Sequence, residues 1–406
     1  MNFFSTGDRR IVLFLMALYA IDPFSYGFVF GYLLSIFIFV NLKKLSHLLD
    51  RTFLSLFLFS TVYAVFYTFN LDMGVQFIFI YALIPASLYL AGKMLYIESE
   101  KLNIQTLFLL GFLFSVSSMA SVFKEIIVHG FVTIKRDVPS IWTGDIVPAT
   151  NTAAYFVMNM CIPGILLVGY KQVKPHFLKI FSVLLFLLSL TCVLRLGSRT
   201  HLAITIFSVL IAVFYRLKKQ NIVQNFVLLA VIFVGVNLGF AYLSLDSDSD
   251  ILSAYADRMD SKEHGVSTAG GRLNKWEKSI IYMFKEPLGW DLDEFGYSHN
   301  LWFDATRIGG VISFVLLLIF TFYTLRILLK VLRIRQKIFL LDGQLLIYFI
   351  SFILVFLVEP ILDGLFVLFS IFCAVVGFTQ SHCLKLDLEK NDKNNSSYSL
   401  NSKELI

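Results

Sequence analysis

Charged residues are scarce in this chain, and their scarcity decides its class. Only 15% of the 406 residues are charged, 57% are hydrophobic, and the mean hydropathy is +0.76. Soluble domains carry about 25% charged residues. Apolar runs near the length of a membrane span recur along the chain, and lipid accepts only helices or closed barrels as spans. Because the alternating ten-residue pattern of barrel strands is missing, we expect an all-α integral membrane protein.

Cysteine is also rare, and the common motifs of soluble enzymes are missing. No C-x-x-C pair occurs, which argues against a disulfide framework or a zinc site. The four cysteines are Cys161, Cys192, Cys373 and Cys383. No Walker-type phosphate loop, G-x-S-x-G or H-E-x-x-H motif occurs. The net charge of +6 comes from basic residues between apolar runs, so it predicts no nucleic-acid partner.

About twelve spans are predicted, with both termini cytoplasmic, because basic residues gather in alternate connections. The predicted spans are residues 11–21, 24–42, 52–69, 74–92, 104–123, 152–170, 178–194, 200–215, 223–243, 308–325, 344–358 and 361–378. The first run lacks a signal-peptide cleavage pattern, so we expect it to be an anchor that forms a short hairpin with the second run.

We divide the chain into three regions. Residues 1–150 contain the N-terminal spans. Residues 151–383 form a core that includes one long polar loop on the outer side, residues 244–307. Residues 384–406 form a polar, Asn/Ser-rich cytoplasmic tail that we expect to be disordered.

The unusual polar residues fall on the outer side, away from the basic connections. Arg199 opens a span after a Gly-Ser pair, where free backbone N–H groups favour anions. Arg272 starts a predicted amphipathic helix whose apolar residues have helical spacing up to Phe284. His299 lies just before the chain re-enters lipid, and an imidazole can accept a proton near neutral pH. Since a guanidinium grips phosphate in a bidentate way, these residues predict a site for a phosphorylated, lipid-linked substrate.

An ordinary structural role remains open for each of these residues. Arg199 would then bind lipid headgroups, Arg272 would be a solvated loop cation, and His299 would be a structural histidine. Arg195, one turn before Arg199, is as consistent with a structural role as with a supporting one. His201 is expected to be an interfacial histidine without a catalytic role.

Acidic residues supply two further candidates. Glu359 ends a span before Pro360, with Asp363 one turn later. A carboxylate there could orient the imidazole or a sugar hydroxyl, or it could be a helix-end carboxylate in water. The Asp-x-Asp-x-Asp run of residues 246–250 has a spacing that can bind a hard cation, but the calcium-loop pattern lacks its sixth-place glycine. We expect a solvated acidic loop and no metal.

The polar residues belong to short motifs that occur in a fixed order between residues 149 and 363. The motifs are Ala149-Thr-Asn-Thr-Ala-Ala154, Leu196-Gly-Ser-Arg-Thr200, Gly271-Arg-Leu-x-x-Trp276 with Phe284-Lys-Glu-Pro-Leu-Gly289, and Ser298-His-Asn300 followed by Gly309-Gly310. This ordered set resembles the O-antigen ligase/polymerase superfamily, the integral-membrane glycosyltransferases of bacterial surface polysaccharide assembly. The first third of the chain matches only as generic spans.

The resemblance implies a fold, a substrate and a site. The fold would be GT-C-like, in the bacterial inner membrane, with the active site facing the periplasm. The donor would be an oligosaccharide on undecaprenyl diphosphate, and the acceptor another glycan. Membrane lipid and a chain-length regulator are further candidate partners, and no cofactor or metal is implied. The two arginines of the family map to Arg199 and Arg272, its histidine to His299 and its acidic residue to Glu359.

Three activities fit this resemblance. A polymerase passes the glycan to another lipid-linked repeat, by inverting and metal-independent transfer, whereas a ligase passes it to lipid A-core. Ligases often carry a longer insertion between the Pro-Leu-Gly and His-Asn motifs, and because residues 290–298 are few, a polymerase is favoured. A flippase or transporter for the same glycan is disfavoured because the clearest charges lie away from the midplane.

Overall fold

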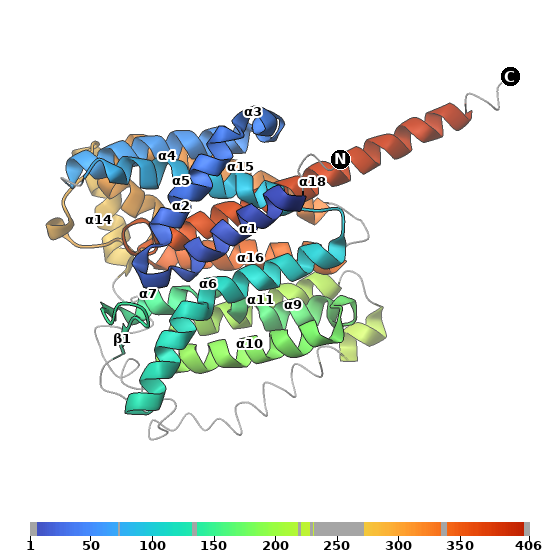
Figure 1. The fold of residues 1–406 in the computed structure, drawn as a ribbon, viewed down its shortest axis with the longest axis horizontal. Helices are drawn as coiled ribbons and strands as arrows, with labels where there is room; N and C mark the ends of the chain where they lie inside the picture. Colours follow the sequence, from blue (N-terminus) through green and yellow to red (C-terminus); the bar gives the residue numbers. More distant parts are fainter. Residues whose placement is uncertain are drawn as a thin grey trace.

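Long helices that run side by side build most of the protein, seen here in a computed structural model (Figure 1). The structure describes residues 6–71, 74–131, 136–217, 221–227, 230, 272–333 and 339–401. Within these ranges, eight helices are long and apolar enough to cross a membrane, or nine if a helix pair bent by 73° forms one span. The chain is therefore a helical, multi-pass membrane protein. The count of twelve stays a prediction, and most of the predicted span 223–243 lies outside the described residues.

The helices follow one another with short connections. The first half contains α1 (Thr6–Ile21), η1 (Pro23–Ser25), α2 (Gly27–Val40), α3 (Leu42–Leu45), η2 (Ser46–Leu48), α4 (Arg51–Asn70), α5 (Gln76–Leu95), α6 (Glu100–His129), β1 (Val138–Pro139), β2 (Ile146–Val147), α7 (Ala149–Ala154), α8 (Val157–Met160), α9 (Ile162–Gly169), η3 (Tyr170–Gln172), α10 (His176–Arg195) and α11 (Arg199–Leu217). The second half contains α14 (Arg272–Lys285), η6 (Leu292–Glu294), α15 (Leu301–Arg333), α16 (Phe339–Val358), α17 (Ile361–Gly364) and α18 (Phe366–Asn401). The predicted amphipathic helix that starts at Arg272 is confirmed as α14.

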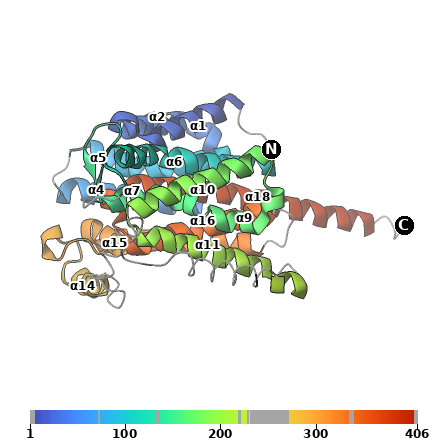
Figure 2. The ribbon, with the colours of Figure 1, turned by 90° about the horizontal axis from the view of Figure 1, so that it is seen from below.

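The two ends of the helical bundle differ in what they carry. The start of α1 and the end of α18 lie toward one end, on the right of Figures 1 and 2. Helices α7 and α14 lie at the opposite end, called the α14 end below. The short antiparallel pair β1–β2, the one departure from an all-α fold within the described residues, is also at the α14 end.

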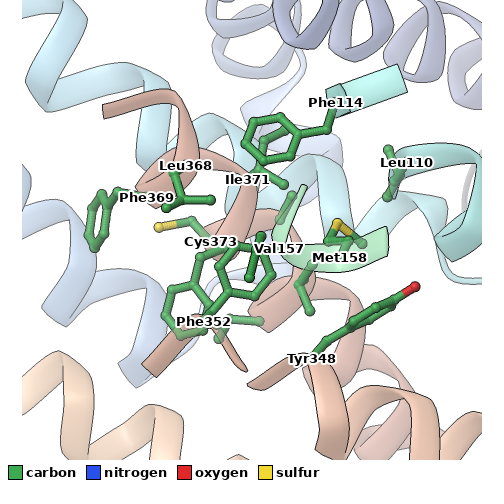
Figure 3. Packing of buried hydrophobic residues seen from close by; sticks show 14 of the residues in the cluster. Leu110, Phe114, Val157, Met158, Tyr348, Phe352, Leu368, Phe369, Ile371 and Cys373 are labelled. Carbon is green, nitrogen blue, oxygen red and sulfur yellow. The ribbon is translucent and has the colours of Figure 1, made fainter. Parts of the chain in front are cut away.

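The centre of the core lies where α6, α8, α16 and α18 meet, and Figure 3 shows their buried side chains in contact. The labelled residues are Leu110 and Phe114 of α6, Val157 and Met158 of α8, Tyr348 and Phe352 of α16, and Leu368, Phe369, Ile371 and Cys373 of α18. Lipid chains are as apolar as these side chains, so close van der Waals packing holds the helices together rather than a hydrophobic driving force.

Glycines permit the closest approach of two helix backbones, α5 and α18. A Cβ atom at Gly92 would lie 1.9 Å from the carbonyl oxygen of Ala374, and one at Gly377 would lie 1.9 Å from that of Tyr89. Small residues at such contacts let two helix axes come close enough for their backbones to touch. The pairing of α5 with α18 therefore depends on both glycines.

The predicted span 152–170 is not one continuous helix. It is divided into α7, α8 and α9, with Pro163 in the first turn of α9. Proline lacks the N–H group that would continue the helix from α8. Gly164 then packs against the backbone of α11, where a Cβ atom would lie 2.3 Å from the Ser208 carbonyl oxygen. Backbone contact with a neighbouring helix thus replaces the regular span.

The last predicted span, residues 361–378, is divided as well. α17 ends at Gly364, and α18 begins at Phe366 and continues to Asn401. The helix therefore extends into the tail that the sequence predicted to be disordered. Residues 384–393 are rich in leucine, lysine and acidic residues, and their leucine, lysine and glutamate favour helix, which a reading of low hydrophobicity alone misses. The division into three regions otherwise stays a prediction.

Gly377→Ala should destabilise the protein, because the new methyl group meets the backbone of α5 and no flexible side chain can yield. We expect a loss of about 1–3 kcal/mol, measured as a lower Tm in detergent. Gly74→Ala is the matched control, since the nearest atoms there belong to the flexible end of the Gln76 side chain. Equal Tm values for the two variants would contradict the close contact.

Candidate functional site

The backbone around His299 is held by one buried carboxylate. The N–H groups of Ser298 and Asn300 donate to the two carboxylate oxygens of Asp304, at 2.8 and 3.1 Å. His299 itself has a φ of 53°, a left-handed conformation that non-glycine residues seldom adopt. Because Asp304 grips both neighbours, it fixes the imidazole at a sharp turn just before α15.

Helix α14 holds the same turn from the other side. The indole Nε1 of Trp276 donates to the Ser298 carbonyl oxygen at 3.0 Å. The hydroxyl groups of Ser279 and Ser298 share a hydrogen bond of 2.6 Å. Both α14 residues follow Arg272, the first residue of the helix, by about one and two turns. The histidine turn and the Arg272 helix therefore form one unit.

The Pro-Leu-Gly and Gly-Gly motifs contact each other. The N–H of Val311 donates to the Pro287 carbonyl oxygen at 2.9 Å. Gly310 interrupts α15 with a φ of 63°, and a Cβ atom there would lie 2.5 Å from that same oxygen. Gly289 has a φ of 119° and approaches the Arg307 carbonyl oxygen equally closely. α15 thus starts at Leu301, before the predicted span 308–325, and the glycines seat its kink on the end of α14.

A short acidic segment between α16 and α18, called the 359–364 turn below, connects the motifs. Glu359 is buried and lies 3.6 Å from Arg272, measured from Oε1 to Nη2. The same Oε1 accepts a hydrogen bond of 3.3 Å from the Thr200 hydroxyl. Glu359 therefore joins the start of α14 to the start of α11. Its predicted role in orienting the imidazole or a sugar hydroxyl stays a prediction.

The rest of the 359–364 turn contacts two more motifs. Asp363 forms an ion pair with Arg307 of α15, and both side chains are almost fully buried. The Arg307 guanidinium also lies over the Tyr297 ring, 5.7 Å from its centroid. The Asn151 amide of α7 donates to the Gly364 carbonyl oxygen at 3.2 Å. All the motifs that carry the predicted site residues are thereby brought to the α14 end.

The environment of His299 favours the neutral imidazole. Burial, with the nearby positive charges of Arg272 and Lys275, lowers its pKa to about 4. Its Nδ1 atom is buried and has no hydrogen-bond partner among the described residues. At neutral pH the ring therefore offers an unprotonated nitrogen beside two cations, an arrangement suited to a base that works next to an anion.

Arg199 stands apart from the ion pairs. It begins α11, is half-buried, and makes no hydrogen bond or ion pair with another described residue. Its neighbour Thr200 contacts Glu359, so Arg199 starts a helix that reaches the 359–364 turn. Arg195 is buried at the end of α10. His201 is buried too, 2.7 Å from the Ser198 hydroxyl, which corrects its prediction as an interfacial histidine.

Three residues near the site were missed by the sequence analysis. Arg307 and Asp304 were assigned to the polar loop, although both lie in α15 and are buried. Arg136 donates from Nε and Nη2 to the Leu196 carbonyl oxygen, at 2.8 and 2.6 Å, and so holds the Leu-Gly-Ser-Arg motif. For the two arginines a signal was present, because each is basic on the side that the positive-inside rule leaves poor in arginine.

Comparison with protein-family models and with curated protein sequences finds no match for this chain. The resemblance to the O-antigen ligase/polymerase superfamily therefore depends on the motifs themselves. The acidic run 246–250 lies outside the described residues, and its metal-binding alternative is untested.

Arg272→Gln should raise the pKa of His299 from about 4 toward the ordinary value, because one of two nearby positive charges disappears. The measurement is an NMR titration of the ring in histidine-labelled protein. Lys278→Gln on the same helix is the control and should leave that pKa almost unchanged. An equal response to the two changes would mean that Arg272 is too far from the imidazole to act on it.

Proposed function

We propose that this chain is a membrane glycosyltransferase that extends a bacterial surface polysaccharide. The donor is a glycan on undecaprenyl diphosphate and the acceptor is a lipid-linked repeat unit. The main support is the clustering at the α14 end of Arg272, Glu359 and the uncharged His299, from three separate segments, with Arg199 at the start of a fourth. The site would face the periplasm of an inner-membrane protein.

The chemistry fits the kinds of residue in this cluster. The bond between the anomeric carbon and the diphosphate oxygen breaks, and negative charge grows on the leaving diphosphate. Guanidinium groups fixed beforehand stabilise that charge more in the transition state than in the ground state. Arg272 and Arg199 would bind the diphosphate, and Glu359 would hold the Arg272 side chain in position.

His299 would take the proton of the acceptor hydroxyl as its oxygen attacks the anomeric carbon, with inversion, and later release that proton to water. The positive charges that lower its pKa make it a weak base in the free protein. A bound diphosphate would neutralise these charges and raise the pKa, so the base would strengthen when the donor is in place.

The short connection after α14 supports a polymerase rather than a ligase. Residues 290–298 contain only η6 and the turns on either side, and the Trp290 N–H donates to the Arg307 carbonyl oxygen at 2.9 Å. This tight return leaves no room for the longer insertion expected of ligases. A ligase that uses the same residues remains the alternative.

Two buried ion pairs favour a second candidate, a transporter of the same lipid-linked glycan. Lys93 lies 2.6 Å from Asp50, and His382 lies 2.7 Å from Asp342. Ionisable residues inside a membrane protein often mark a transport path. Asp50, however, is the N-cap of α4, and Asp342 lies in the first turn of α16, so both acids sit at helix ends. They suit a role in closing the bundle better than a relay at mid-depth.

His299→Ala should reduce chain extension by about 10²–10⁴-fold, measured in vitro with purified lipid-linked substrate, while the protein still accumulates in the membrane. His129→Ala is the control, since that histidine is exposed near the end of α6. Because the imidazole must be neutral to act, kcat/KM should fall as the pH drops through about 4. The fall in kcat should lie at higher pH, where the donor is bound. Full-length polymer from His299→Ala would exclude the role of a base.

Deletion of the gene should separate the candidate activities, and the readout is a gel of the surface polysaccharide. A single repeat on lipid A-core is the result expected for a polymerase. Bare core with accumulated lipid-linked polymer would indicate a ligase, and lipid-linked units trapped inside the cell would indicate a transporter. An unchanged polysaccharide pattern would remove all three activities.

A further inference from the structure

A polar cavity of about 240 Å³ opens at the α14 end, between the turn after α1, the helix α6 and the β1–β2 pair. Eight of its lining residues carry hydroxyl groups and two carry carboxylates, and no lysine, arginine or histidine lines it. Its floor includes the buried Ser121 and Thr152, while Trp142 and Asp145 form an exposed rim. The cavity is therefore open to a ligand that offers many hydroxyl groups.

The aromatic side of the cavity is fixed in place. The indole Nε1 of Trp142 donates to the Ser117 hydroxyl at 3.0 Å, and its ring lies 5.1 Å from that of Phe24. The indole nevertheless remains 36% exposed. The face of an aromatic ring is electron-rich and attracts the polarised C–H groups of a sugar ring. A rigid, partly exposed indole beside hydroxyl groups suits a saccharide.

Several polar groups in the cavity are available to a ligand. The hydroxyl groups of Ser118 and Tyr155 make no hydrogen bond with another described residue, and the Asp145 carboxylate makes none either. Hydroxyls can donate and accept, and a carboxylate accepts. Because carboxylates repel phosphate, this cavity is unsuited to the diphosphate that we assign to the arginines. Its volume is comparable with one or two sugar rings, since a water molecule occupies about 30 Å³ in the liquid.

The cavity is joined to the candidate site through two neighbouring segments. Thr152 lines the cavity from α7, and the preceding Asn151 binds the Gly364 carbonyl oxygen of the 359–364 turn. Val138 of β1 lines the cavity two residues after Arg136, which holds the Leu-Gly-Ser-Arg motif. Figure 1 shows α7 and β1 at the same end of the bundle as α14. A glycan that reaches the catalytic cluster could therefore enter this cavity.

We propose that this cavity is a subsite for a sugar unit of the glycan substrate, separate from the arginines that hold the diphosphate. The proposal rests on the proposed function, because that function supplies the glycan. The cavity recognises hydroxyl groups and a ring face, so it selects the sugar and contributes nothing to the charge of the transition state.

The test measures binding to the full-length protein in detergent by calorimetry. One probe is the free oligosaccharide released by mild acid from the lipid fraction of source cells, and the other is inorganic pyrophosphate. Trp142→Ala should weaken oligosaccharide binding by about tenfold or more and leave pyrophosphate binding unchanged. Ser118→Leu should have the same effect by filling the cavity. Tyr26→Ala, an exposed aromatic outside the lining, is the control.

The two proposals fail in different ways. If Trp142→Ala and Ser118→Leu both bind the oligosaccharide like the Tyr26→Ala control, the subsite is wrong even where His299→Ala stops chain extension. If the oligosaccharide binds and both cavity variants weaken it, the subsite stands even where His299→Ala leaves extension intact, and only the transferase proposal is lost. An oligosaccharide that does not bind the unmodified protein would overturn the subsite as well.

Discussion

The pairing of two buried carboxylates in the 359–364 turn is the constraint on which the candidate site depends. A carboxylate removed from water costs several kcal/mol unless a cation and hydrogen bonds compensate it. Glu359 and Asp363 meet this requirement with arginines from two other segments, Arg272 of α14 and Arg307 of α15. Removal of either partner would leave a buried charge uncompensated. The requirement therefore draws α14, α15 and the turn together at one end of the bundle.

The position of the imidazole follows from that arrangement. α14 begins at Arg272 and carries the tryptophan and serine that hold the backbone beside His299. α15 supplies Asp304, whose two oxygens accept the N–H groups on either side of the same residue. Because both helices are anchored through arginines to the 359–364 turn, the imidazole is fixed relative to the acidic residues. A base placed in this way needs little rearrangement before it acts.

Sequence alone predicts the parts of this site that depend on local pattern, and it misses those that depend on long-range pairing. The amphipathic α14 and its start at Arg272 follow from residue spacing, and the arginine, histidine and glutamate are shared out among segments that the structure joins. The partners Arg307 and Asp363 are 56 residues apart in sequence, and no local pattern relates them. The division of the predicted span 152–170 was hidden for a similar reason, since Gly164 meets a helix that is distant in the chain.

The two arginines that pair with the 359–364 turn differ in what they leave available. Arg307 is 3% exposed and closely paired, so its charge is used within the fold. Arg272 is 26% exposed, and its 3.6 Å separation from Glu359 is long for a charge-assisted hydrogen bond. Arg199 and Lys275 add positive charge nearby, so three cations face one carboxylate. An excess of fixed positive charge beside a neutral imidazole is unfavourable without a ligand, and a dianion would balance it. A diphosphate meets that condition, whereas a neutral glycan does not.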